Sequence, residues 1–99
     1  MAFVNDYDFD VLVNEAERMV VKELGNQLGE PQAAGVCVCE DCVLDMAALA
    51  LNTVKPLYRV SLLGSLYAAH AADQSEYMES IRIAVKTAIE KVSKNPSHD

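Results

Sequence analysis

The chain has 99 residues, a formal net charge of −7 and a hydrophobic content of 52% without any tryptophan. This length suits one domain, so we expect residues 1–99 to fold as a single unit of marginal stability. The acidic charge would repel a phosphate backbone and argues against direct binding to nucleic acid. No apolar run approaches the ~20 residues that cross a bilayer, and the acidic N-terminus lacks a signal-peptide pattern. We therefore expect a cytoplasmic protein that does not bind membranes.

An amphipathic pattern near the start of the chain predicts a first helix from about Asn5 to Gln27. Its apolar residues recur at three- and four-residue steps, as one face of a helix requires. Asn5 and Asp6 are suitable N-caps for a helix that begins there. The Gly-Glu-Pro sequence at positions 29–31 ends the helix, and residues 31–36 are expected to form a loop.

Two further helices are predicted from the remaining sequence. The second runs from about Glu40 to Asn52 and is apolar nearly all round, so we expect it to be buried centrally. Pro56 breaks the helical pattern, and Tyr58–Val60 alternates in polarity, which fits either one irregular strand or a loop. A long third helix is predicted from about Leu66 to Ser93, and Pro96 follows its end.

These elements predict an all-α fold, a small three-helix domain with one irregular extended loop segment. The apolar stripes of the two long helices are wide enough to serve both an internal core and a partner. Because twofold symmetry is the commonest arrangement of identical subunits, we expect a twofold homodimer.

Three cysteines stand close together at Cys37, Cys39 and Cys42, in a C-x-C-x-x-C run. This odd, tightly spaced set is a poor disulfide framework, whereas soft thiolates bind zinc or an iron–sulfur cluster. We predict a structural zinc site. Zinc takes four ligands, so the fourth comes from His98, from His70, from water or from a partner chain.

Two other interpretations of the cysteines stay open. They could be three free thiols, partly buried in a loop. Alternatively, Cys39 and Cys42 could cycle between dithiol and disulfide, although thioredoxin-like motifs follow a strand in a βαβ setting that this sequence does not show. Motifs for hydrolysis, such as a Gly-rich phosphate loop or a zinc-protease helix, are not found in the sequence.

The block from Cys37 to Asn52, with its Ala-Leu-Ala-Leu-Asn ending, resembles the late competence protein ComFB family. The family pattern continues in a proline and a tyrosine, here Pro56 and Tyr58, in a Gly-x-Leu-Tyr run at positions 64–67, and in Asn-Pro-x-His at positions 95–98. Two departures are Lys55-Pro56-Leu57 in place of Pro-Pro, and Arg59 after the tyrosine.

The resemblance implies a non-enzymatic helical homodimer, with a zinc site in the cysteine-bearing members. Some members of the family, mostly those without the cysteines, are receptors for cyclic dinucleotides such as cyclic di-GMP. A twofold dimer would present each basic residue twice to the two phosphates of such a ligand. Lys55, Tyr58 and Arg59 are the candidate contacts, because an arginine and an aromatic share one loop.

Two helical pairs of basic residues are weaker candidates for the same ligand. Arg82 and Lys86 are one turn apart, as are Arg18 and Lys22, and Glu79 and Glu90 are well placed to neutralise the first pair.

The sequence therefore predicts a dimeric, zinc-binding regulatory protein that acts as a cyclic dinucleotide receptor. The alternatives are a protein-interaction adaptor with structural zinc and no small ligand, and a thiol redox protein.

Overall fold

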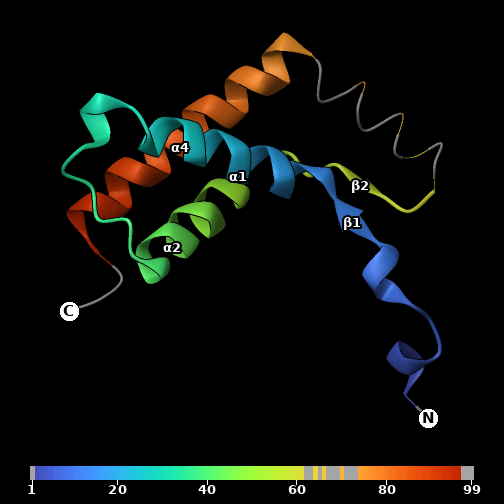
Figure 1. The fold of residues 1–99 in the computed structure, drawn as a ribbon. Coiled ribbons are helices and arrows are strands. Elements are labelled where there is room, and N and C mark those ends of the chain that lie inside the picture. The colour runs from blue at the N-terminus through green and yellow to red at the C-terminus, as the bar shows by residue number, and fades with distance from the viewer. Residues whose placement is uncertain (1, 62–63, 65, 67–69, 71–73, 97–99) are drawn as a thin grey trace.

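The computed structural model describes residues 2–61, 64, 66, 70 and 74–96. Within these residues, three α-helices pack together: α1 (Glu15–Leu28), α2 (Glu40–Leu51) and α4 (Ser75–Lys94) (Figure 1). The short strands β1 (Val13–Asn14) and β2 (Tyr58–Arg59) pair antiparallel, Val13 opposite Arg59. Short 3-10 turns span Phe3–Asn5, Phe9–Val11 and Pro31–Ala33. The predicted all-α class and three-helix architecture are confirmed.

The first helix begins later than the sequence predicts, at Glu15 rather than near Asn5. The residue before it, Asn14, has extended backbone angles and belongs to β1, and its Oδ1 accepts a hydrogen bond of 3.1 Å from the amide of Ala16. Asn14 is therefore the N-cap, and the expected caps Asn5 and Asp6 are wrong. Pairing with β2 holds Val13 and Asn14 extended, and the residues before them form short 3-10 turns, although the apolar spacing suits a helix.

Helix α2 has nearly the predicted limits, but its burial is one-sided. Cys42, Met46 and Ala50 are buried on the face that packs against α1 and α4. On the opposite face the side chain of Leu44 is 60% exposed. The expected central burial therefore holds for the face with Cys42, Met46 and Ala50, but not for the face with Leu44, which no element of the described chain covers.

The third predicted helix is interrupted before α4. Gln74 has an extended conformation, with ψ of 130°, so α4 starts at Ser75 instead of continuing from Leu66. The sequence also predicts an apolar core stripe for this helix, made of Tyr67, Ala71, Met78, Ile81, Val85, Ala88, Ile89 and Val92. Tyr67 and Ala71 lie outside the described residues. Met78 is helical but 47% exposed, so its expected burial is wrong. The other described residues of the stripe are buried and helical: Ile81, Val85, Ala88, Ile89 and Val92.

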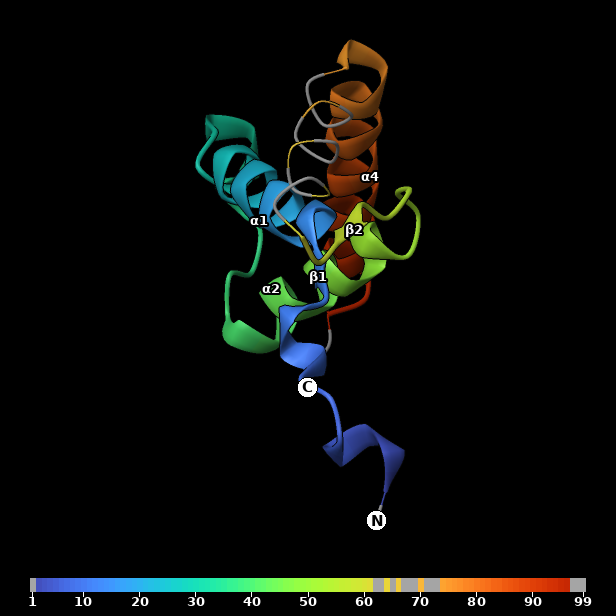
Figure 2. The ribbon, with the colours of Figure 1, turned by 90° about the vertical axis from the view of Figure 1, so that its right-hand side faces the viewer.

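The three helices enclose one hydrophobic core, and each of them contributes buried residues to it. Figure 2 shows α1 and α4 side by side, with the two short strands at one end of the helices. The core residues are Ala16, Val20, Leu24, Cys42, Met46, Ala50, Val54, Ile81, Val85, Ala88, Ile89 and Val92. Among the helices of the described chain, none has the length and apolar character needed to span a bilayer.

Hydrogen bonds hold the loop after α2 against the other helices. The Oδ1 of Asn14 accepts from the Leu57 amide at 2.8 Å, and the Leu57 carbonyl accepts from the Glu15 amide at 2.8 Å. The Tyr77 hydroxyl donates to the Lys55 carbonyl at 2.7 Å. The extended segment at residues 58–60 is thus a strand over Tyr58–Arg59, positioned by α1 and α4.

Candidate metal centre

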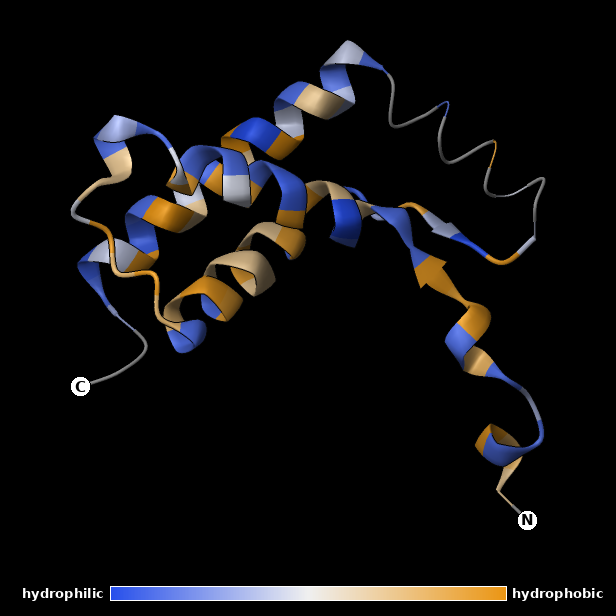
Figure 3. Ribbon diagram, viewed as in Figure 1, coloured by the Kyte–Doolittle hydropathy of each residue, from blue (hydrophilic) through white to orange (hydrophobic). Residues whose placement is uncertain are grey.

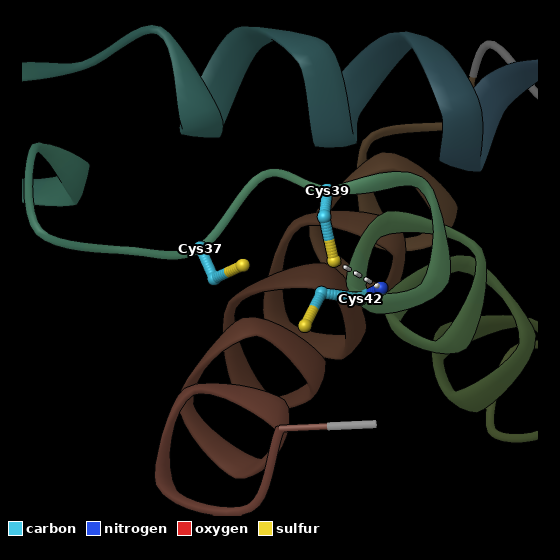
Figure 4. A group of neighbouring side chains, drawn as sticks. All are labelled: Cys37, Cys39 and Cys42. Carbon is cyan, nitrogen blue, oxygen red and sulfur yellow. Dashed lines mark hydrogen bonds between the residues drawn. The ribbon is translucent and has the colours of Figure 1, made fainter. Parts of the chain in front are cut away.

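The sulfur atoms of Cys37, Cys39 and Cys42 all lie within 4.8 Å of one another (Figure 4). A tetrahedral zinc ion with Zn–S bonds of about 2.3 Å holds two sulfur ligands about 3.8 Å apart. The three sulfurs are therefore at most about 1 Å farther apart than a single zinc ion would hold them. Three cysteines this close together could hold a metal ion.

The start of α2 positions the cluster and favours its thiolate form. Cys39 is the N-cap of α2, and its Sγ accepts a hydrogen bond of 3.5 Å from the amide of Cys42. Amide groups and the positive end of the helix dipole stabilise a thiolate at this position. A hydrogen bond from the backbone of Cys39, helped by the Cys39 and Cys42 thiols, lowers the pKa of the Cys37 thiol.

The three cysteines differ in burial, and they join the surface to the core. Cys42 is 1% exposed and belongs to the core cluster, Cys37 is half-buried against that cluster, and Cys39 is exposed. In Figure 4 the C-terminal turns of α4 run beside the sulfur atoms. A metal ion here would tie the loop before α2 to the junction of α2 and α4.

The fourth ligand is not found among the described residues. Of the histidine, cysteine and acidic side chains there, only the three cysteines form this group. His70 is exposed, and its Nε2 lies 3.4 Å from the Nε2 of Gln74. His98, the other candidate from the sequence, lies outside the described residues.

The three candidate ligand contacts in the loop after α2 have different environments. Arg59 donates from Nε to the Oε1 of Glu15 at 2.6 Å, and this bond lowers the pKa of the Glu15 carboxyl. The side chain of Tyr58 is 61% exposed, and Lys55 is also exposed. A hollow of about 380 Å³ lies beside Arg59 and is lined by Leu12, Val13, Asn14, Glu15, Glu17, Arg18 and Arg59. Lys55 and Tyr58 do not line this hollow.

The helical basic pairs are partly neutralised, as the sequence suggests. Arg82 forms an ion pair of 2.5 Å with Glu79, whose pKa it lowers by hydrogen bonding. Arg18 forms an ion pair of 3.3 Å with Glu15.

A groove between α1, the turn Pro31–Ala33 and α4 was not foreseen from the sequence. Its volume is about 540 Å³. Gln27 crosses it, donating to the Glu23 carboxylate at 2.7 Å and to the Arg82 carbonyl at 3.0 Å. The lining residues come from three separate segments, so no local pattern could have indicated them.

Known proteins place the chain in a family. No curated protein matches the sequence closely enough to identify a relative. Among solved structures, the chain is similar to one presented as a structural characterisation of the late competence protein ComFB from Bacillus subtilis, with a TM-score of 0.67 and 26% identity. This match covers 87% of our chain and 92% of the other. The family model for the late competence development protein ComFB matches residues 13–96. The chain therefore belongs to the ComFB family.

Proposed function

We propose that this ComFB-family chain is a non-enzymatic, dimeric regulatory protein of the cytoplasm, with a structural zinc ion and a cyclic dinucleotide such as cyclic di-GMP as its ligand. The observation that carries the proposal is the cluster of three cysteine sulfurs at the start of α2. The family is described as that of a late competence development protein, and this description supports regulation rather than catalysis.

Zinc suits the cysteine cluster because soft thiolates select it and a four-ligand site restrains a small fold. Cys37, Cys39 and Cys42 would hold the ion, and His98 would complete its coordination. His98 follows the end of α4 at Lys94 by four residues, a length that spans at most about 14 Å. The ion would then cross-link the loop before α2 to the chain after α4.

The cyclic dinucleotide is supported by the chemistry of the loop after α2. Tyr58 exposes a ring on which a guanine base could stack, and the exposed Lys55 could pair with a phosphate. Arg59 would bind the ligand by exchanging the Glu15 carboxylate for a phosphate. In a twofold dimer the same three residues would serve both phosphates.

The second candidate is a protein-interaction adaptor with structural zinc and no small ligand. It is favoured by the Arg59–Glu15 ion pair, which already occupies the guanidinium, and by the exposed apolar face of α2 at Leu44. A thiol redox protein is the third, since the same proximity of the sulfurs would permit a disulfide.

Native mass spectrometry of the purified protein, with and without cyclic di-GMP, separates these functions. We expect a dimer with one zinc ion per chain, and added ligand mass that the double variant Lys55→Ala/Tyr58→Ala loses while keeping zinc and dimer. A zinc-loaded dimer that ignores the ligand would favour the adaptor. A metal-free protein with a reversible disulfide in thiol titration would favour the redox protein, and a metal-free monomer without one would contradict all three.

A further inference from the structure

Residues 55–59, which carry the candidate ligand contacts, are held against both α1 and α4. Leu57 is 9% exposed and packs against Met19 of α1 and Tyr77 of α4, in a small apolar cluster. The hydropathy colouring of Figure 3 shows the chain just before β2 as apolar and β2 itself as mainly hydrophilic. Because neighbouring side chains of an extended chain point in opposite directions, burial of Leu57 leaves the Tyr58 ring, which is 61% exposed, facing solvent.

Hydrogen bonds fix the backbone of this segment from the same two sides. On the side of α1, the Leu57 amide donates to Asn14 Oδ1 and the Leu57 carbonyl accepts from the Glu15 amide, both at 2.8 Å. On the side of α4, the Tyr77 hydroxyl donates to the Lys55 carbonyl at 2.7 Å. The segment is therefore fastened at two points, Lys55 to α4 and Leu57 to α1.

Tyr77 is itself firmly placed. It lies in the first turn of α4, one turn before the buried Ile81 on the same face of the helix, and its ring packs against the main core as well as against Leu57. Burial raises the pKa of the Tyr77 hydroxyl above its ordinary value, so the group keeps its proton and remains a donor through the neutral pH range. A helix anchored in the core thus presents one stable donor to the segment that carries the ligand contacts.

We propose that Tyr77 is a positioning residue for the cyclic dinucleotide. Its hydroxyl holds the backbone from which the Lys55 side chain extends, and its ring holds Leu57, the neighbour of Tyr58. The ammonium group and the aromatic ring that would meet the ligand are therefore placed before the ligand arrives, and a segment that is already ordered loses less conformational entropy on binding. Tyr77 touches no ligand atom in this scheme, and its role rests on the ligand contacts of the proposed function.

Calorimetric titration of the protein as purified with cyclic di-GMP tests this role. Tyr77→Phe removes the hydroxyl but keeps the ring against Leu57, so we expect the dissociation constant to rise about three- to tenfold, as the loss of one hydrogen bond predicts. The matched control is Ser80→Ala, which removes another hydroxyl of α4 that donates to a backbone carbonyl, that of Tyr77 at 2.6 Å. That bond does not involve residues 55–59, so the control should bind like the parent.

A double-mutant cycle shows whether the Tyr77 hydroxyl acts through Lys55. If it does, Tyr77→Phe should weaken binding by less than about twofold in a Lys55→Ala background, because the side chain that it positions is already gone. A merely structural role would lower the affinity by the same factor in both backgrounds.

Hydrogen–deuterium exchange of the ligand-free protein measures the order of the segment separately. We expect Tyr77→Phe to speed exchange in peptides that cover residues 55–60, because the segment loses its hydrogen bond to α4. Exchange in the buried turns of α2 should not change, since that helix makes its own hydrogen bonds.

The outcomes separate the positioning role from the proposed function. A parent protein that binds cyclic di-GMP, together with a Tyr77→Phe variant that binds it equally well, would overturn the positioning role alone. An equal loss of affinity in both backgrounds of the cycle, or loss of zinc or of the dimer in Tyr77→Phe, would show a structural residue and would also overturn it. A parent protein that binds no cyclic di-GMP would overturn the receptor function and, with it, any role of Tyr77 in binding.

Discussion

Cys39 combines two roles at one position. Its sulfur caps α2 by accepting from the Cys42 amide, and it lies within 4.8 Å of the other two sulfurs of the candidate metal site. Serine is a favoured N-cap but a poor ligand for zinc. Replacing this single atom therefore separates capping from metal binding.

We predict that Cys39→Ser loses the metal ion and lowers the free energy of unfolding by several kcal/mol, because the cap survives while a structural metal site does not. Elemental analysis and denaturant unfolding measure the two effects. Val38→Ser, at an exposed neighbour, is the control and should keep its metal. A Cys39→Ser protein that unfolds like the parent would count against a structural site.

Glu15 makes the stability of the fold depend on acid. Its side chain is 14% exposed and accepts from Arg59 and Arg18, and these bonds lower the pKa of its carboxyl in the folded state. The unfolded carboxyl has a pKa of about 4.3, so the folded chain binds this proton less readily than the unfolded chain. The stabilisation is complete above that value and is lost as the pH falls through the lower folded pKa.

We predict that the free energy of unfolding of Glu15→Gln falls less steeply than that of the parent as the pH decreases from about 6 to about 3. Urea unfolding at a series of pH values measures the slope. Any acid release of the metal is common to both proteins and cancels in the comparison. Glu17→Gln, at an exposed site on the same turn of α1, should keep the parent's slope.

At the scale of elements, Asn14 joins β1, α1 and the loop after α2. One side-chain oxygen accepts from the Ala16 amide at 3.1 Å and from the Leu57 amide at 2.8 Å. It therefore starts a helix and fixes a loop that is 43 residues further along the chain. The position of Tyr58 and Arg59 depends on this contact, because both follow Leu57 directly.

We predict that Asn14→Ala lowers the free energy of unfolding by about 1–3 kcal/mol, through the lost cap and the unpaired Leu57 amide. Asn26→Ala, on the exposed side of α1, should be neutral or slightly stabilising, because alanine is the better helix former. Denaturant midpoints compare the two. Equal stabilities for both variants would show that the Asn14 contacts make no net contribution to the free energy of unfolding.

At the scale of the whole molecule, one core of three helices carries the stability, and the candidate metal site lies at its edge. Cys42 belongs to the core itself, and Cys37 packs against it. A metal ion would restrain the loop before α2, which packs against the core through Val36 and Cys37. A small domain of this length gains much from such a restraint.

We predict that a strong chelator under reducing conditions lowers the Tm of the protein, and that added zinc restores it, because the ion binds the folded chain in preference to the unfolded one. Differential scanning calorimetry measures the shift. The chelator should not change the Tm of Cys39→Ser. A parent protein whose Tm the chelator also leaves unchanged would contradict a structural metal.

The sequence by itself determined the features that depend on residues close together along the chain. The spacing of Cys37, Cys39 and Cys42 indicated the cluster, the local pattern placed α2 within a residue of its observed end, and the motifs around it indicated the ComFB family. Only the tertiary structure decided where α1 begins, because β1 pairs with residues more than forty positions away. For the same reason, the Arg59–Glu15 ion pair and the α1–α4 groove appear only when distant segments pack, and helical periodicity describes one segment at a time.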